Sequence, residues 1–176
     1  MKYIFDFDDV IFHTTKHRKE HMFPLLEKSG IPKQQIDEYY QKTRVSGFSL
    51  RKMLAHFNRD GLYEEIMGNT DDHKNTISIN VIKKLGKENC FLITHGGDDF
   101  QNEKITRTNV APLFSKIIIL VGSKKNAVEE ICKQYKDEIV YFIDDKAIYF
   151  EDLNREKYPN LKTILYTGQD LEPYFQ

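Results

Sequence analysis

Short apolar runs that end in polar residues recur along the chain. They are Tyr3-Ile4-Phe5, Cys90-Phe91-Leu92-Ile93 and the segments 117–121, 139–143 and 161–166. Continuous runs of β-branched and aromatic residues of this length are typical of strands buried on both faces, as in a parallel sheet. Helical patterns precede or separate the later runs, over 76–86, 98–110 and 124–136. This alternation predicts a doubly wound α/β domain.

The stretch between the first two runs has a different pattern, because residues 14–75 contain no strand-like run. Helices are favoured over 16–28, 33–43, 50–58 and 62–68. Gly30, Pro32 and Ser49 suit the boundaries between these segments. We therefore expect a Rossmann-like core formed by residues 1–13 and 76–176, with a small α-helical cap over 14–75 inserted after the first strand.

The composition limits the classes of protein that fit this pattern. The chain has 176 residues, 40% of them hydrophobic and 30% charged, which suffices for one core with a small insertion. A net charge of -1 does not indicate nucleic-acid binding, although it does not exclude a local basic patch. No apolar run approaches the ~18 residues of a membrane span, so we expect no membrane partner. Acids by position 6 do not fit a secretory signal, and Cys90 and Cys132 lack zinc-ligand spacing. We expect an intracellular, cytoplasmic protein.

Polar residues follow four of the predicted strands directly. They are Asp6 and Asp8 after the first, Thr94, His95 and Gly96 after the second, Lys124 and Lys125 after the third, and Asp144 and Asp145 after the fourth. Ligands of open parallel sheets bind at the carboxyl ends of the strands. If the strands are parallel and adjacent, these groups meet at one edge of the sheet.

Such an edge has a definite chemistry. Several carboxylates in close quarters need a cation, because like charges repel one another, and oxygen ligands with a few waters suit Mg²⁺. A carboxylate beside the metal can attack phosphorus, while a Thr hydroxyl and a Lys ammonium hold the phosphoryl oxygens. A strand-end acid alone often only caps a helix, but the ordered set of four groups favours a phosphoryl-transfer site.

At this point the sequence resembles the haloacid dehalogenase-like (HAD) superfamily. Its four motifs are matched in order by residues 4–12, by Leu92-Ile93-Thr94, by residues 124–131 and by residues 141–145. Many members carry a cap between the first and second motifs, where the helical insertion lies. Two positions depart from the common pattern: Asp9 replaces a frequent Gly and adds an acid near the metal, and His95 replaces a frequent Asn.

The resemblance implies a role for each matched residue. Asp6 would be the nucleophile and Asp8 the general acid and base. Thr94 and Lys124 would bind the phosphoryl group, with Lys125 as the alternative to Lys124. Asp6, the backbone carbonyl of Asp8 and Asp145 would bind Mg²⁺, with Asp144 close behind or sharing that role. An Asp at the position of Asp8 goes with phosphatases of this family, so a small phosphorylated molecule is the expected substrate.

Other functions stay open at this level. A regulatory module that binds phosphate or metal without turnover is one alternative, and a phosphatase for nucleotides or nucleic-acid ends is another. A product with a transferred phosphoryl group is also compatible with the motifs. A two-component receiver domain is disfavoured, because its phosphorylated Asp follows the third strand, where this chain has Gly122-Ser123-Lys124.

The insertion contributes further candidates. Arg44 and Arg51 flank a Gly-containing joint and could reach a substrate anion, with an ordinary interhelical turn as the alternative. His95 and Gly96 could present backbone N–H groups to the phosphate, with a plain turn as the alternative. His13, His17 and His21 recur every four residues, a spacing that can bind a transition metal but also suits a solvated helix face. Lys16, Arg18 and Lys19 make the start of the insertion basic.

Overall fold

The structure is a computed structural model that describes residues 1–175, except for the side chain of Asp98. Its centre is a five-stranded sheet with the strand order β3-β2-β1-β4-β5, in which every pairing is parallel. The strands are β1 (Lys2–Phe5), β2 (Cys90–His95), β3 (Lys116–Leu120), β4 (Val140–Asp144) and β5 (Leu161–Leu165). This confirms the predicted doubly wound α/β class.

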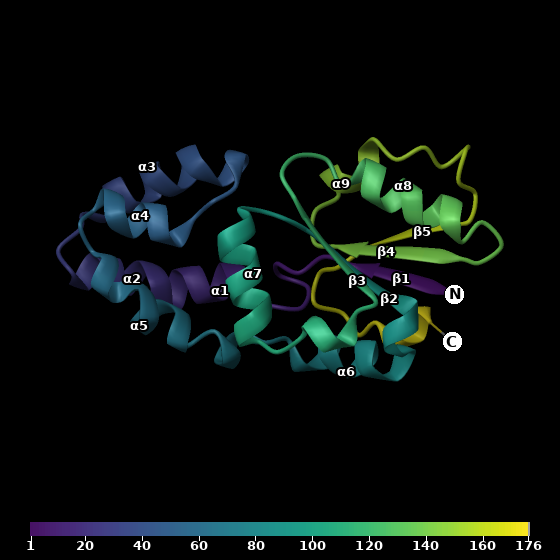
Figure 1. The fold of residues 1–176 in the computed structure, drawn as a ribbon, viewed down its shortest axis with the longest axis horizontal. Coiled ribbons are helices and arrows are strands. Elements are labelled where there is room, and N and C mark those ends of the chain that lie inside the picture. Colours follow the sequence, from purple (N-terminus) through teal and green to yellow (C-terminus); the bar gives the residue numbers. More distant parts are fainter. Residues whose placement is uncertain (176) are drawn as a thin grey trace.

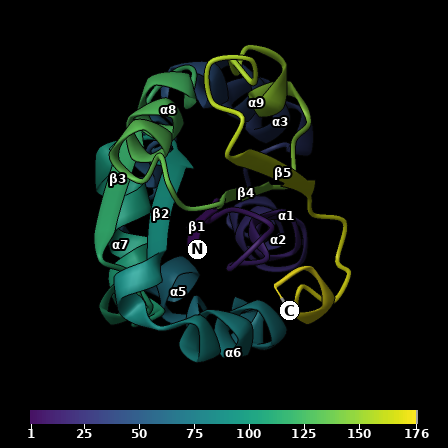
Figure 2. The ribbon, with the colours of Figure 1, turned by 90° about the vertical axis from the view of Figure 1, so that its right-hand side faces the viewer.

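Helices cover both faces of the sheet (Figures 1 and 2). One face packs on α6 (Thr76–Leu85) and α7 (Asp98–Arg107) through Ile79, Ile82 and Ile105. The other face packs on α8 (Lys125–Gln134) and the short α9 (Ile148–Glu151), where Val128 and Ile131 are buried. The helices change face between β3 and β4, so β1 and β4 lie side by side at the point where a doubly wound sheet opens a crevice.

The insertion is helical throughout. It contains α1 (Thr14–His17), a π-helical turn (Arg18–Met22), α2 (Phe23–Lys28), α3 (Lys33–Thr43), α4 (Leu50–His56) and α5 (Tyr63–Gly68). The wide turn ends two residues before Pro24, which has no amide hydrogen and whose ring collides with the carbonyl four residues earlier in a regular helix. The helix predicted over 16–28 is therefore three consecutive helical pieces.

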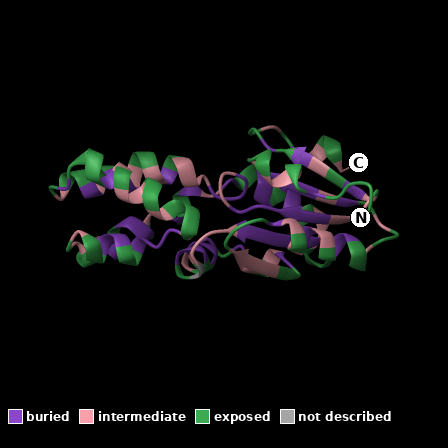
Figure 3. Ribbon diagram, turned by 90° about the horizontal axis from the view of Figure 1, so that it is seen from above, coloured by how far each residue is buried: buried purple, intermediate pink, exposed green. Residues whose placement is uncertain are grey.

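The cap helices share an apolar cluster of their own, separate from the two clusters on the sheet. Its fully buried members include Leu26, Ile36 and Leu54. Figure 3 shows buried residues in both parts of the molecule, along the strands and within the cap helices. Phe100 of α7 belongs to the cap cluster and stacks edge-on against Phe48, so one core helix anchors the cap. The exact bounds predicted for the cap and the core stay a prediction.

Candidate active site

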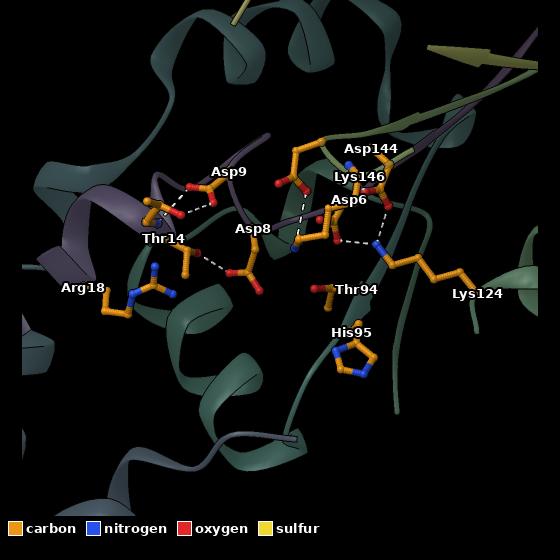
Figure 4. Close-up of polar contacts among 12 residues, drawn as sticks. Asp6, Asp8, Asp9, Thr14, Arg18, Thr94, His95, Lys124, Asp144 and Lys146 are labelled. Atoms are coloured by element: carbon orange, nitrogen blue, oxygen red, sulfur yellow. Dashed lines mark hydrogen bonds and ion pairs between the residues drawn. The ribbon is translucent and has the colours of Figure 1, made fainter. Parts of the chain in front are cut away.

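A cavity of about 540 Å³ lies between the carboxyl ends of the strands and the cap. Four groups of residues meet there: the loop after β1, the loop after β2, the start of α8 and the loop after β4 (Figure 4). Of the residues predicted for the site, those that line the cavity are Asp6, Asp8, His95, Gly96, Lys124, Asp145 and Arg44. Thr94 is fully buried behind Gln101, and Asp144 is fully buried against Lys124.

Lys124 lies at the centre of the buried charges. Its Nζ is 2.7 Å from Oδ1 of Asp6 and 2.6 Å from Oδ2 of Asp144. Burial alone would lower the pKa of Lys124, but the two carboxylates outweigh it and raise that pKa. Lys125 is partly exposed and pairs at 3.9 Å with Glu129 on its own helix. The structure therefore brings Lys124 to the strand ends and leaves Lys125 outside.

Three carboxylates gather at the ends of β1 and β4. One oxygen each from Asp6, Asp144 and Asp145 lies within 4.8 Å of the others, and no other such group occurs among the described residues. Burial raises the pKa of Asp6 to about 6, with Asp144 and Asp8 adding repulsion against the attraction of Lys124. Burial and the neighbouring Asp6 and Asp9 likewise raise the pKa of Asp145 to about 6. The cluster is thus unfavourable in its ionised form without a cation.

Asp8 has a very different environment from Asp6. Its Oδ1 accepts from Lys104 Nζ at 2.5 Å and from the Thr14 hydroxyl, and its Oδ2 accepts from Gln101 Nε2 at 2.6 Å. Burial alone would raise the pKa of Asp8, but Lys104 and these hydrogen bonds outweigh it and hold the pKa below its usual range. Two carboxylates two residues apart are therefore tuned in opposite directions.

Asp9 faces the cap instead of the carboxylate cluster. Its carboxylate accepts from Thr15 N at 2.8 Å and from the Thr15 hydroxyl at 2.6 Å, so it caps the start of the cap helix. Asp9 also has a positive φ of 57°, a conformation that Asp tolerates better than most residues. The acid that we expected near the metal is therefore engaged by the insertion.

The cap contributes Arg44 to the cavity, but not Arg51. Arg44 is exposed at the end of α3, and its Nη1 lies 3.3 Å from Oε1 of Gln41. The guanidinium of Arg51 stacks on Tyr63, with Cζ 3.7 Å from the ring centroid, and Arg51 is absent from the cavity lining. Of the two arginines, only Arg44 is placed where it can meet a ligand.

Comparisons with known proteins give a consistent fold. No family model and no curated protein matches the sequence. A solved structure from Burkholderia xenovorans LB400, described as a haloacid dehalogenase-like hydrolase, superposes with a TM-score of 0.70 at 15% identity, over 92% of this chain and 81% of that one. The chain has the haloacid dehalogenase-like fold.

Two further structures of this fold are similar. The HAD-hydrolase YfnB from Bacillus subtilis, solved with bound magnesium, has a TM-score of 0.50 at 16% identity, over 82% of this chain and 79% of that one. A haloacid dehalogenase-like family hydrolase from Xanthomonas campestris has a TM-score of 0.51 at 14% identity, over 85% and 75%. Identities this low establish the shared fold alone.

Several residues of this HAD-like site were not predicted from the sequence. They are Gln101 and Lys104 on α7, and Lys146 and Tyr149 after β4. Arg18, which the sequence indicated only as part of a basic group at the start of the cap, also lines the cavity. Gln101 bridges the site, since its Nε2 also lies 2.7 Å from the carbonyl of His95 and 3.2 Å from the Thr94 hydroxyl. Lys146 lies 3.6 Å from Asp145, and although burial alone would lower the pKa of Lys146, the Asp carboxylates around it outweigh burial and raise that pKa.

His17 and His21 connect the first helical segments of the cap to α5 by hydrogen bonds. Nε2 of His17 donates to the carbonyl of Ile66 at 3.2 Å, and Nε2 of His21 donates to that of Glu65 at 3.0 Å. The ring of His73 meets that of His17 edge-on, with centroids 4.9 Å apart. Among the described residues these rings form no metal-ligand cluster. No described helix is long and apolar enough to cross a membrane.

Proposed function

We propose that this protein is a Mg²⁺-dependent phosphatase of the HAD type that hydrolyses a small phosphomonoester. One observation carries the proposal: Asp6, Asp8, Lys124 and Asp145 line one cavity at the strand ends, with Thr94 and Asp144 buried directly behind this lining. The cavity volume of about 540 Å³ is in the range of small-molecule sites, which favours a metabolite over a nucleic-acid end. A cytoplasmic location stays part of this proposal.

In the first step, a carboxylate oxygen of Asp6 forms a bond to phosphorus while the bond from phosphorus to the ester oxygen breaks. Lys124 neutralises Asp6 and the phosphoryl oxygens, and the Thr94 hydroxyl donates to one of those oxygens. Asp8 gives its proton to the leaving oxygen, so the alcohol departs neutral. The product on the enzyme is an aspartyl phosphate.

In the second step, water attacks the phosphorus and the bond to Asp6 breaks, which releases inorganic phosphate. Asp8, now a carboxylate, takes the proton of that water. Lys104, Thr14 and Gln101 favour this ionised form of Asp8, because all three donate hydrogen bonds to its oxygens. The surroundings of Asp8 thus suit its role as the base of the second step. For its role as the acid of the first step, Asp8 must carry a proton although these three donors favour the carboxylate.

The carboxylate cluster fits Mg²⁺. Oδ1 of Asp145 is buried without a hydrogen bond, and its nearest cation, Lys146 Nζ, is too distant at 3.6 Å to donate one. Asp144 is already engaged, through Lys124 and through the backbone N–H of Lys146 at 2.9 Å. Asp6, Asp145 and the Asp8 carbonyl would therefore hold the ion, and Asp144 would anchor Lys124. The bound ion supplies positive charge to the phosphoryl oxygens.

The test is phosphate release from p-nitrophenyl phosphate, with Mg²⁺ and with excess EDTA. The wild type should be active only with Mg²⁺, and Asp6→Asn should lose about a thousandfold or more in kcat, because the nucleophile is gone. Asp137→Asn is the matched control, since Asp137 is exposed beyond the other end of the sheet. Turnover by Asp6→Asn at the wild-type rate would overturn the mechanism.

A further inference from the structure

The cavity has a core side and a cap side, and the charged side chains that line it differ between the two sides. All four lining carboxylates, those of Asp6, Asp8, Asp9 and Asp145, come from the core or from the loop after β1. The lining lysines also come from the core, and each has a carboxylate partner: Lys104 with Asp8, Lys124 with Asp6 and Lys146 with Asp145. The cap contributes Arg18 and Arg44, and within the described part of the chain neither has a carboxylate within ion-pair distance.

Arg18 is held in place without being neutralised. Its side chain is half-buried, its Nη1 donates to the hydroxyl of Tyr40, and its Cζ lies 4.5 Å from the Tyr40 ring centroid and 5.9 Å from that of Phe23. These contacts fix the plane of the guanidinium but use one of its five N–H donors. Figure 4 shows Arg18 reaching into the site from the side opposite to Lys124.

The wall between the two charged regions is largely apolar. Met22, Phe48 and Phe100 line it, together with the ring of Tyr40. Phe48 stacks edge-on against both Phe100 and Tyr40, at centroid distances of 5.2 and 5.3 Å, so these rings form one continuous aromatic surface. A ligand that reaches from Asp6 to Arg18 therefore carries an organic portion between two polar ends.

We propose that the substrate is a phosphomonoester with a second anionic group, a carboxylate or another phosphate, which Arg18 binds and Arg44 assists. The inference rests on the proposed phosphatase function, because it assigns the reacting phosphoryl group to Asp6. A guanidinium with a fixed plane and free N–H groups recognises an oxyanion by paired, charge-assisted hydrogen bonds. In a substrate with a single anion, that anion is the reacting phosphoryl group at Asp6. Arg18, on the opposite side of the cavity, would then have no anionic partner.

The experiment compares substrates that differ only in the second anion. One pair is 3-phosphoglycerate and glycerol 3-phosphate, and the other is fructose 1,6-bisphosphate and fructose 1-phosphate. The wild type should favour the two-anion member of at least one pair by about tenfold or more in kcat/KM, and the preferred pair distinguishes carboxylate from phosphate. Arg18→Met should bring that preference ratio close to one, a reduction of about tenfold or more, mainly through KM. Arg18→Lys should fall between the two, since it keeps the charge and loses the fork.

Arg51→Met is the matched control. Arg51 also stacks on a cap tyrosine, but it does not line the cavity, so its variant should keep the wild-type preference ratio. Affinities of the same pairs are measured by calorimetry on Asp6→Asn protein, in which binding does not depend on turnover. Equal affinities within each pair, or an unchanged ratio in Arg18→Met, overturn the anion site. If the wild type has no phosphatase activity but shows the affinity preference, the proposed function is overturned and the anion site is not.

Discussion

Lys124 and Lys125 are neighbours in the chain with opposite surroundings. The resemblance to the HAD family favoured Lys124, because Val128 and Ile131 then follow four and seven residues later, as in that family's helix. The structure places Lys124 between two buried carboxylates. A buried lysine of this kind is held by its partners, because the cost of removing its charge from water must be offset by ion pairs. Lys125 lacks that environment. The difference between the two lysines depends on tertiary contacts, which residue type and spacing do not show.

Lys104 is the residue that most affects the proton chemistry of Asp8. Lys104→Met removes the main charge that lowers the pKa of Asp8, so this pKa should rise. At a given pH, less Asp8 would then be ionised to activate water. We expect kcat for p-nitrophenyl phosphate to fall about tenfold or more near pH 6, and to recover partly as the pH rises, because the acidic limb of the profile moves to higher pH.

The measurement is kcat against pH for wild type and Lys104→Met, with unfolding by urea to separate lost activity from lost stability. Lys83→Met, an exposed change on α6, is the control and should keep the wild-type profile. A lower kcat with an unmoved acidic limb would show that Lys104 acts on the packing among Phe7, Phe12 and Phe100 and not on Asp8.

At the scale of elements, the strands were the easiest to predict. Most are apolar runs in a sheet that is covered on both faces, although β5 has Lys162 and Thr163 in its middle. The structure ends each strand within about two residues of the expectation. The helix over 98–110 gave a weaker pattern for a physical reason. Its inward stripe carries Gln101, Lys104 and Thr108, which are polar and yet almost fully buried. Polar residues on a buried stripe were the available signal for the partners of Asp8.

The helix predicted over 16–28 carries His17 and His21, and the burial of His17 determines its protonation. Burial lowers the pKa of His17 from 6.5 to about 4, with His73 and His21 adding repulsion. The unfolded chain therefore binds more protons at this residue than the folded chain does between pH 6.5 and pH 4. The free energy of unfolding should fall as the pH falls through that window, by an amount on the order of 3 kcal/mol at pH 4.

His17→Gln tests this assignment, because glutamine can still donate to the Ile66 carbonyl but does not titrate in this range. The variant should show a shallower loss of stability between pH 6.5 and pH 4 than the wild type, measured by urea unfolding at each pH. The exposed His56 on α4 provides the control, and His56→Gln should keep the wild-type slope. Identical slopes for wild type and His17→Gln would contradict the buried, neutral state of His17.

At the scale of the whole molecule, the site depends on how the cap sits on the core. The two parts meet along α7 and the loop before it: the Ser49 hydroxyl donates to Asp99 at 2.6 Å, and Arg107 pairs with Glu64 of α5 at 2.8 Å. These partners lie about 40 to 50 residues apart in the chain. A single sequence carries no periodic pattern for such contacts. The cap could therefore be predicted as a unit, but its position on the core could not.

Two glycines, Gly47 in the cap and Gly97 in the core, lie where the backbones of the two parts come close together. A Cβ at Gly97 would lie 2.5 Å from the carbonyl oxygen of Phe48, and one at Gly47 would lie 3.1 Å from the backbone nitrogen of Gly97. Gly97 has a φ of -67°, which alanine adopts without strain, so Gly97→Ala acts through this contact and not through backbone conformation. The added methyl group should push residues 47–48 away from the loop after β2.

That displacement moves Phe48 and Arg44 relative to Asp6, and small misplacements of binding groups are costly in catalysis. We expect Gly97→Ala to lower kcat/KM by about tenfold or more for the preferred phosphomonoester, and urea unfolding separates this effect from the stability lost to the clash, about 1–3 kcal/mol. Gly61→Ala is the matched control in the cap, because nothing lies within 4 Å of its added Cβ. Wild-type kcat/KM in Gly97→Ala would mean that the reaction proceeds without this contact between the cap and the loop after β2.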